Sequence, residues 1–185
     1  MTTFDYREAR AYTSRYGAIV GGMWIASFAF FIIGLRNPLA GNLCLITGVM
    51  SVVAAGWFIR RFRATRSLKF MQALWMSLQF YLYASLLMAA AQYIYFRYMD
   101  NGLLADTMEA AMGMPAYREM LASMLPNGEN PEELVTQVVE TFRATPAIEI
   151  TFSMLFNNLI LGMFLCLPTT IIGLTGKTGN NLQNK

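Results

Sequence analysis

The sequence predicts an all-α membrane protein, a bundle of four transmembrane helices with a short helical extracytoplasmic insertion between the third and the fourth. Of the 185 residues, 56% are hydrophobic and only 14% are charged, whereas a soluble domain carries about 25% charged residues. The uncharged residues gather into four runs, each long enough to cross about 30 Å of hydrocarbon as a helix. Basic residues stand at the ends of these runs, as they do in membrane proteins.

The first expected span covers residues 17–35 and follows a tail of residues 1–16. No charged residue lies between Arg15 and Arg36. The run is longer than the hydrophobic core of a secretory signal peptide, and no clear cleavage site follows it. We therefore expect it to remain in the protein as an anchor.

The second and third spans are expected over residues 39–59 and 70–96. Pro38 separates the first two spans because proline cannot continue the incoming helix. A basic loop of residues 60–69 joins the second span to the third. It contains five basic residues and no acid, namely Arg60, Arg61, Arg63, Arg66 and Lys69.

An acidic insertion is expected over residues 97–145, before a fourth span of residues 146–174 and a tail of residues 175–185. The insertion holds eight acids and three arginines. Asn130 followed by Pro131 is typical of a helix start, and a helix-prone stretch over residues 103–125 is interrupted near Gly113. The pattern favours short amphipathic helices on the outer membrane surface or over the mouth of the bundle.

Charge predicts the orientation. The two tails and the basic loop together carry ten basic residues, and the opposite side carries Arg36, Arg97, Arg118 and Arg143. Positive residues are retained in the cytoplasm, so both termini are expected there. An inverted protein would have to hold the five basic residues of one short loop outside.

Polar residues within the spans are candidate intramembrane contacts, listed as Gln79, Gln92, Asn157 and Asn158. Such amides usually join helices, at about 0.6 kcal/mol each. A polar substrate pocket built from Gln79 and the two asparagines is the alternative.

The sequence lacks histidine and has two separate cysteines, and it contains none of the common phosphate-binding, metal-binding or hydrolase motifs. No span carries an ionisable residue near its middle, where proton relays place one. We therefore expect no cofactor, no metal site, no nucleic-acid partner and no enzyme activity. A lipid-modifying enzyme would need acids of the insertion, such as Glu109 and Glu119, to converge on a cavity.

Three features carry a family resemblance. They are Tyr16-Gly17 at the start of the first span followed by Gly21-Gly22, the basic loop, and the sequence Tyr-Ile-Tyr-Phe-Arg-Tyr-Met-Asp-Asn-Gly over residues 93–102. The chain resembles a family of small inner-membrane proteins of Bacteroidota that share a domain of unknown function. The resemblance implies no catalytic residues and an association with polyprenyl-phosphate glycosyltransferases.

The function expected from these features is that of a non-catalytic scaffold or accessory subunit of a membrane complex, with a protein partner or a second copy of the chain. The five residues of the basic loop are the candidate contacts for anionic lipid headgroups or for that partner. The alternative is a small carrier or lipid-binding module of the membrane.

Overall fold

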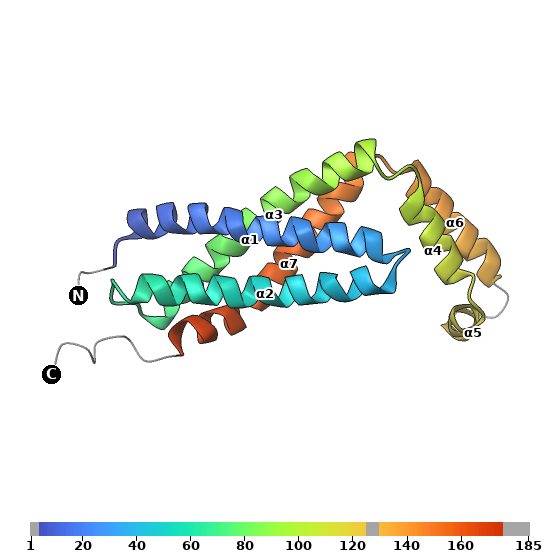
Figure 1. The fold of residues 1–185 in the computed structure, drawn as a ribbon. Helices are drawn as coiled ribbons and strands as arrows, with labels where there is room; N and C mark the ends of the chain where they lie inside the picture. The colour runs from blue at the N-terminus through green and yellow to red at the C-terminus, as the bar shows by residue number, and fades with distance from the viewer. Residues whose placement is uncertain (1–3, 125–129, 176–185) are drawn as a thin grey trace. The chain divides into compact units, whose positions relative to one another are not determined.

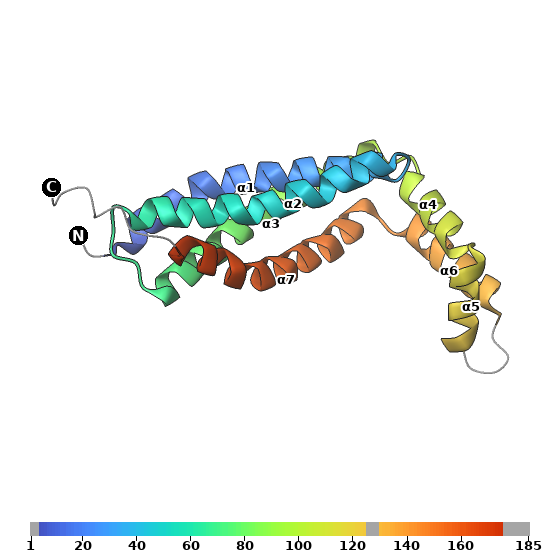
Figure 2. The same ribbon diagram turned by 60° about the horizontal axis from the view of Figure 1, so that its bottom comes forward.

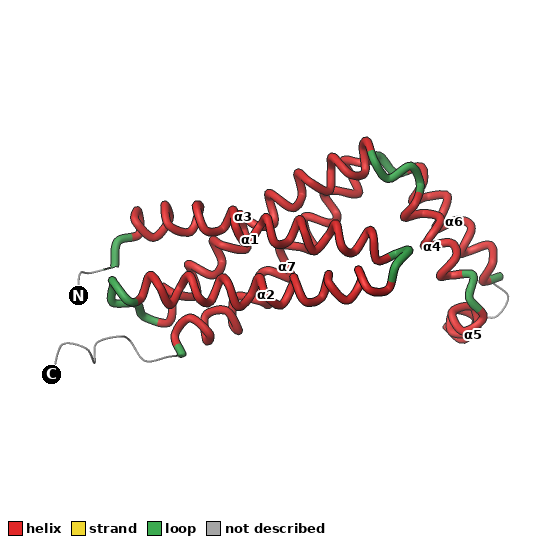
Figure 3. The backbone as a smooth tube through the Cα atoms, in the orientation of Figure 1, coloured by secondary structure: helices red, strands yellow, loops and turns green. Residues whose placement is uncertain are grey.

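The computed structural model of the protein describes residues 4–124 and 130–175, which contain seven α-helices and no strand (Figures 1 and 3). Four are long, and three short ones lie between the third and fourth long helices. In chain order they are α1 (Tyr6–Gly34), α2 (Pro38–Arg63), α3 (Phe70–Tyr98), α4 (Leu103–Met112), α5 (Pro115–Met124), α6 (Pro131–Ala144) and α7 (Ala147–Leu174). The all-α prediction is confirmed for the described residues.

The chain forms two compact units. Among the described residues, the first comprises 4–91 and 153–175, and the second comprises 92–124 and 130–152. The helices α1, α2, α3 and α7 have 29, 26, 29 and 28 residues, and each is long and apolar enough to cross a membrane. The four runs predicted as spans therefore correspond to four candidate membrane helices.

Two helix boundaries extend by four or more residues beyond the predicted spans. The first helix begins at Tyr6 because the Asp5 side chain caps it, accepting a hydrogen bond from Arg7 N at 2.8 Å. The second helix continues to Arg63, so three arginines of the predicted loop stand on its last turn. The C-terminal tail lies outside the described residues from residue 176 onward, together with its two lysines.

The helices α1 and α2 form an antiparallel hairpin (Figures 1 and 2). Asn37 caps α2 by accepting from Leu39 N at 3.1 Å, and proline follows it at the first helical position. Backbones come close near the turn, where a Cβ on Gly34 would lie 2.7 Å from Gly41 N. The sequence therefore encodes both the turn and the close approach beside it.

Glycines of α1 and α2 pack against the other long helices. A Cβ added to Gly17 would lie 3.0 Å from Tyr83 Cβ of α3. One added to Gly56 would lie 2.5 Å from Ile172 Cγ2 of α7. The glycine pair Gly17 and Gly21, typical of close helix packing, thus faces α3 within the same chain.

The second unit contains the three short helices of the insertion. The interruption predicted near Gly113 is present, because α4 ends at Met112 and α5 begins at Pro115. Asn130 caps α6 as predicted, accepting from Glu132 N at 3.0 Å. Arg143 of α6 joins α4 through ion pairs to Asp106 at 2.8 Å and Glu109 at 2.9 Å.

The last long helix begins at Ala147, one residue later than the start predicted at Pro146. The carbonyl of Pro146 accepts the first helical hydrogen bonds, from the amides of Glu149 and Ile150. The Thr145 hydroxyl donates to Thr141 O of α6 at 2.7 Å. The side chain of Thr145 therefore makes its hydrogen bond with the last turn of α6.

Candidate functional site

One end of the first unit brings together the start of α1, the end of α2, the start of α3 and the end of α7. We call it the basic end, because it carries the five residues of the predicted basic loop. The ring of Tyr6 meets the ring of Trp75 edge-on at 5.6 Å, which joins α1 to α3. The ring of Phe62 of α2 lies 5.1 Å from that of Tyr12 of α1. Aromatic packing therefore holds the chain segments of this end together.

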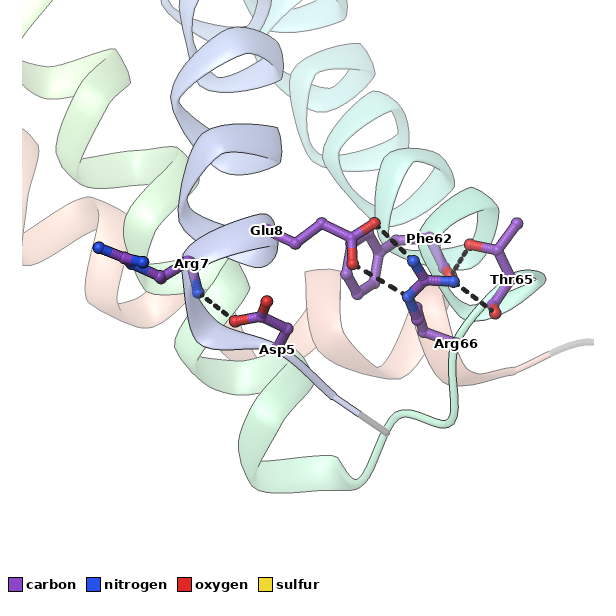
Figure 4. Close-up of polar contacts among 6 residues, drawn as sticks. All are labelled: Asp5, Arg7, Glu8, Phe62, Thr65 and Arg66. Carbon is purple, nitrogen blue, oxygen red and sulfur yellow. Dashed lines mark hydrogen bonds and ion pairs between the residues drawn. The ribbon is translucent and has the colours of Figure 1, made fainter. Parts of the chain in front are cut away.

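Arg66 and Glu8 form a two-pronged ion pair at the basic end (Figure 4). The guanidinium Nε donates to Oε2 at 3.0 Å and Nη2 donates to Oε1 at 2.9 Å. Such a parallel pair fixes geometry better than a single contact does. It links the α2–α3 loop to the first turns of α1.

Arg60 and Arg63 bind the carboxyl end of α7. Arg60 Nη2 donates to Ile172 O at 2.9 Å and also to Thr175 O. Arg63 donates to Leu174 O. The last carbonyls of a helix lack partners within the helix and carry partial negative charge. These two arginines therefore cap α7.

The remaining two residues of the basic loop have no ion pair in the described part of the chain. The Arg61 guanidinium lies 5.6 Å from the centre of the Trp57 ring, in a cation–π contact. The Lys69 backbone N–H donates to Gln72 Oε1 at 2.9 Å, and its side chain is exposed. The structure thus gives side-chain hydrogen bonds within the chain to three of the five predicted lipid or partner residues, namely Arg60, Arg63 and Arg66.

A series of polar contacts crosses the middle of the first unit. Trp24 Nε1 of α1 donates to Ser51 Oγ of α2 at 3.0 Å. The Trp24 ring lies 5.7 Å from that of Tyr81 of α3, whose hydroxyl is hydrogen-bonded to Thr169 of α7. The series joins all four long helices through buried side chains.

Two buried serines of α3, Ser77 and Ser85, lie on either side of Tyr81 in the sequence. Ser77 Oγ lies 2.9 Å from Thr170 Oγ1, and both side chains are fully buried. Ser85 Oγ is buried without a hydrogen-bond partner among the described residues. An unpaired buried hydroxyl costs free energy, so Ser85 is a point of local destabilisation in the first unit.

Two apolar cavities lie along α3 and α7. The first, of about 480 Å³, begins at the basic end and is lined there by Tyr6, Met71 and Gln72, and by Trp75 further along. The second, of about 370 Å³, continues past Gln79. Both are lined by Leu78 and Met163, so the two cavities are neighbours along α3 and α7, and we call them together the α3–α7 groove.

A third cavity, of about 320 Å³, is lined mainly by α2 and α7 and includes Ser27, Cys44 and Asn158. Ser27 Oγ donates to Cys44 O at 2.9 Å in its wall. Its polar surface is therefore small, and most of its lining side chains are aliphatic.

The structure separates the predicted intramembrane amides. Gln79 lines the α3–α7 groove and Asn158 lines the third cavity. Asn157 is exposed on α7 and lines neither. Gln92 is buried in the second unit. The structure does not bring Gln79 and the two asparagines into one cavity.

Sequence reasoning missed Tyr81, Thr169 and Thr170, which supply the buried hydroxyls between α3 and α7. Hydroxyl residues are common in membrane helices, so their type alone gave no signal. Among the described residues, no group of three or more His, Cys, Asp or Glu side chains is placed to hold a metal ion. Cys44 and Cys166 are free thiols.

These features define a helical protein with four candidate membrane helices and polar side chains enclosed between them. The chain belongs to the family described as "Protein of unknown function (DUF4199)", whose family model matches residues 15–173. The predicted resemblance to a family with a domain of unknown function is thereby confirmed. No curated protein and no solved structure matches the chain.

Proposed function

We propose that this protein is a multi-pass protein of the bacterial inner membrane and acts as a non-catalytic scaffold or accessory subunit of a membrane complex. The observation that carries the proposal is the outward apolar surface of the four long helices. On α7, Phe164 is 72% exposed and Phe156 is 66% exposed, and on α2 Leu45 is 70% exposed. Exposure of so many large apolar side chains to water is unfavourable, whereas the hydrocarbon of a lipid bilayer would cover them.

The proposed orientation places the basic end in the cytoplasm. Arginines are retained on that side during insertion, and this end holds all of the basic loop. The insertion of the second unit then faces the periplasm, where its acids meet no such constraint. In this arrangement, Arg60 and Arg63 have two roles, to orient the helices and to cap α7.

The buried polar groups support a structural rather than a catalytic role. The hydroxyls of Ser51, Ser77 and Thr170 and the indole of Trp24 all take part in contacts between or within helices. Groups engaged in this way hold helices together. We therefore propose that the protein acts by binding other molecules rather than by catalysis.

Cysteine labelling tests the topology. In a chain with Cys44 and Cys166 replaced by alanine, Ser67→Cys lies in the α2–α3 loop and Asn101→Cys lies between α3 and α4, and both positions are exposed. In spheroplasts, a membrane-impermeant maleimide should label Asn101→Cys and should reach Ser67→Cys only after lysis. Labelling of Ser67→Cys in intact spheroplasts would contradict the orientation.

Co-purification tests the scaffold role. The full chain, extracted from native membrane in mild detergent, should carry one partner in a fixed ratio. A polyprenyl-phosphate glycosyltransferase is the first candidate to examine. The variant Arg61→Gln removes an exposed cation of the basic end without touching the α7 cap and should weaken that ratio if an acidic cytoplasmic surface binds there. Purification of a lone monomer would contradict the proposal.

A lipid-binding module is the second candidate function, and the cavities of the first unit favour it. Asn158 lines the third cavity whereas the adjacent Asn157 is exposed. If the third cavity holds a ligand through its amide, Asn158→Leu should abolish binding while Asn157→Leu leaves it unchanged. A loss of stability without a loss of bound lipid would assign Asn158 to packing alone.

A further inference from the structure

We propose that the α3–α7 groove binds one anionic phospholipid, with an acyl chain along the groove and the phosphate at the basic end beside Lys69 and Arg7. This inference rests on the proposed insertion into a membrane. It specifies the ligand class of the lipid-binding role and its place in the first unit. Of the four predicted intramembrane amides, only Gln79 lines this groove.

The groove has the dimensions and surface of an acyl-chain site. Its lining runs along α3 from Met71 to Leu82, a rise of about 16 Å at about 1.5 Å per residue. Its walls are almost wholly apolar, with Leu74, Leu78 and Met163 among them. A hydrocarbon chain fits such a surface, and a polar substrate would lose its hydrogen bonds there.

The groove opens at the basic end, where its lining becomes polar. Tyr6 is 59% exposed there, so its phenol stands at the surface. The Oε1 atom of Gln72 accepts the Lys69 N–H, which leaves the amide NH₂ group as a donor. A phenol and an amide donor at the mouth of an apolar groove suit the phosphate and glycerol region of a lipid.

Charge at this mouth favours an anion. Lys69 lies two residues before Met71, the first α3 residue of the lining, and Arg7 directly follows Tyr6. Neither cation has an ion pair in the described part of the chain. Figure 4 shows Arg7 directed away from Glu8, whose carboxylate is occupied by Arg66. Two cations without an ion pair among the described residues therefore lie next to lining residues of the mouth in the chain. A cation near the membrane surface attracts an anionic headgroup by about 1 kcal/mol.

Tryptophan fluorescence tests the site because Trp75 lines the groove whereas Trp57 is exposed and lines none of the three cavities of the first unit. The full chain with Trp24→Phe and Trp57→Phe keeps Trp75 as its reporter. A second chain with Trp24→Phe and Trp75→Phe keeps Trp57. Both are reconstituted into vesicles of phosphatidylcholine mixed with phosphatidylglycerol, with brominated acyl chains on one lipid at a time.

Trp75 should be quenched more by brominated phosphatidylglycerol than by brominated phosphatidylcholine at equal mole fraction. Lys69→Gln and Arg7→Gln should each lower that preference about fivefold, the change that about 1 kcal/mol produces. Arg61→Gln, at the same end but outside the groove, should leave the preference at Trp75 unchanged. Trp57 should report a weaker preference than Trp75.

Three outcomes would overturn the proposal. Equal quenching of Trp75 by both lipids would show a groove without headgroup selectivity. An equal effect of Lys69→Gln and Arg61→Gln would show attraction by surface charge in general. If neither tryptophan were quenched by any lipid, the membrane insertion itself would fail. Native mass spectrometry of the chain with all three tryptophans provides a second readout, since phosphatidylglycerol should be retained in a one-to-one ratio and Lys69→Gln should release it.

Discussion

Ser77 Oγ of α3 lies 2.9 Å from Thr170 Oγ1 of α7, and neither side chain is exposed. The two residues are 93 positions apart in the sequence. Thr170 also donates to Cys166 O within its own helix, and Ser77 contacts Ala73 O in the same way. Each hydroxyl has a single hydrogen, so one of the pair donates across the α3–α7 interface while the other donates to the carbonyl of its own helix.

Replacing this pair should weaken the α3–α7 interface measurably. Ser77→Ala should lower the free energy of unfolding in detergent micelles by about 0.6 kcal/mol, the usual value for a hydrogen bond between membrane helices. Thr170→Val should do the same, and the double variant should lose less than the sum of the two. Ser153→Ala, on an exposed face of α7, is the control and should have no effect. Strict additivity would show that the two hydroxyls do not interact.

A substitution at the glycine contact between α2 and α7 should have a larger effect on stability. A Cβ on Gly56 would lie 2.5 Å from Ile172 Cγ2 and 2.8 Å from Ile172 Cβ. Gly56→Ala should therefore destabilise the protein by about 1–3 kcal/mol through overpacking. Gly22→Ala is the matched control, because no atom lies within 4 Å of its added Cβ, and it should be neutral or stabilising. Denaturation in mixed micelles measures both, and equal stabilities would contradict the packing.

The arginine cap of α7 should control fraying of its last turn. Arg63→Gln removes the cation that donates to Leu174 O. Amide hydrogen exchange over residues 170–174 should become several-fold faster, because the freed carbonyls lose both a hydrogen bond and a favourable charge. Arg61→Gln leaves the cap intact and should not change that exchange. Unchanged exchange in Arg63→Gln would show that the cap does not stabilise the helix end.

Salt should loosen the second unit. Arg143 bridges Asp106 and Glu109 of α4 with its side chain 50% exposed, so the ion pairs are screened as ionic strength rises. In Arg143→Gln, hydrogen exchange over residues 103–112 should be faster at low salt and should approach the unaltered protein at high salt. Arg118→Gln removes only the α5–α6 pair with Glu132 and should leave α4 unchanged. If the difference in exchange between Arg143→Gln and the unaltered protein did not depend on salt, Arg143 would stabilise α4 by packing and not by charge.

The parts of the fold that could be predicted from the sequence are those determined by local residue patterns. Asn37 and Asn130, each followed by proline, cap their helices as their residue types indicate. The charge-free runs correspond to the four long helices. These features depend on neighbours within a few residues, so a single sequence contains all the information needed to predict them.

The parts that resisted prediction depend on how the helices rotate and meet. Asn157 and Asn158 differ by about 100° around α7, and only packing decides that Asn158 lines a cavity. The partners of Arg60 and Arg63 are backbone carbonyls more than 100 residues away, and carbonyls have no residue-specific signal. The charge of the basic loop could be predicted from the sequence. Which of its cations cap a helix and which have no ion pair among the described residues could not.

The position of the insertion has a consequence for assembly during synthesis. Roughly 50 residues separate the end of α3 from the start of α7, which a ribosome working at about 5–20 residues per second needs some 2–10 seconds to add. During that interval Ser77 and Tyr81 have no α7 hydroxyls to bond with, and in the proposed membrane arrangement other groups must shield them from hydrocarbon. A membrane insertase or chaperone that holds α3 until the last helix arrives would govern the yield of correctly assembled protein.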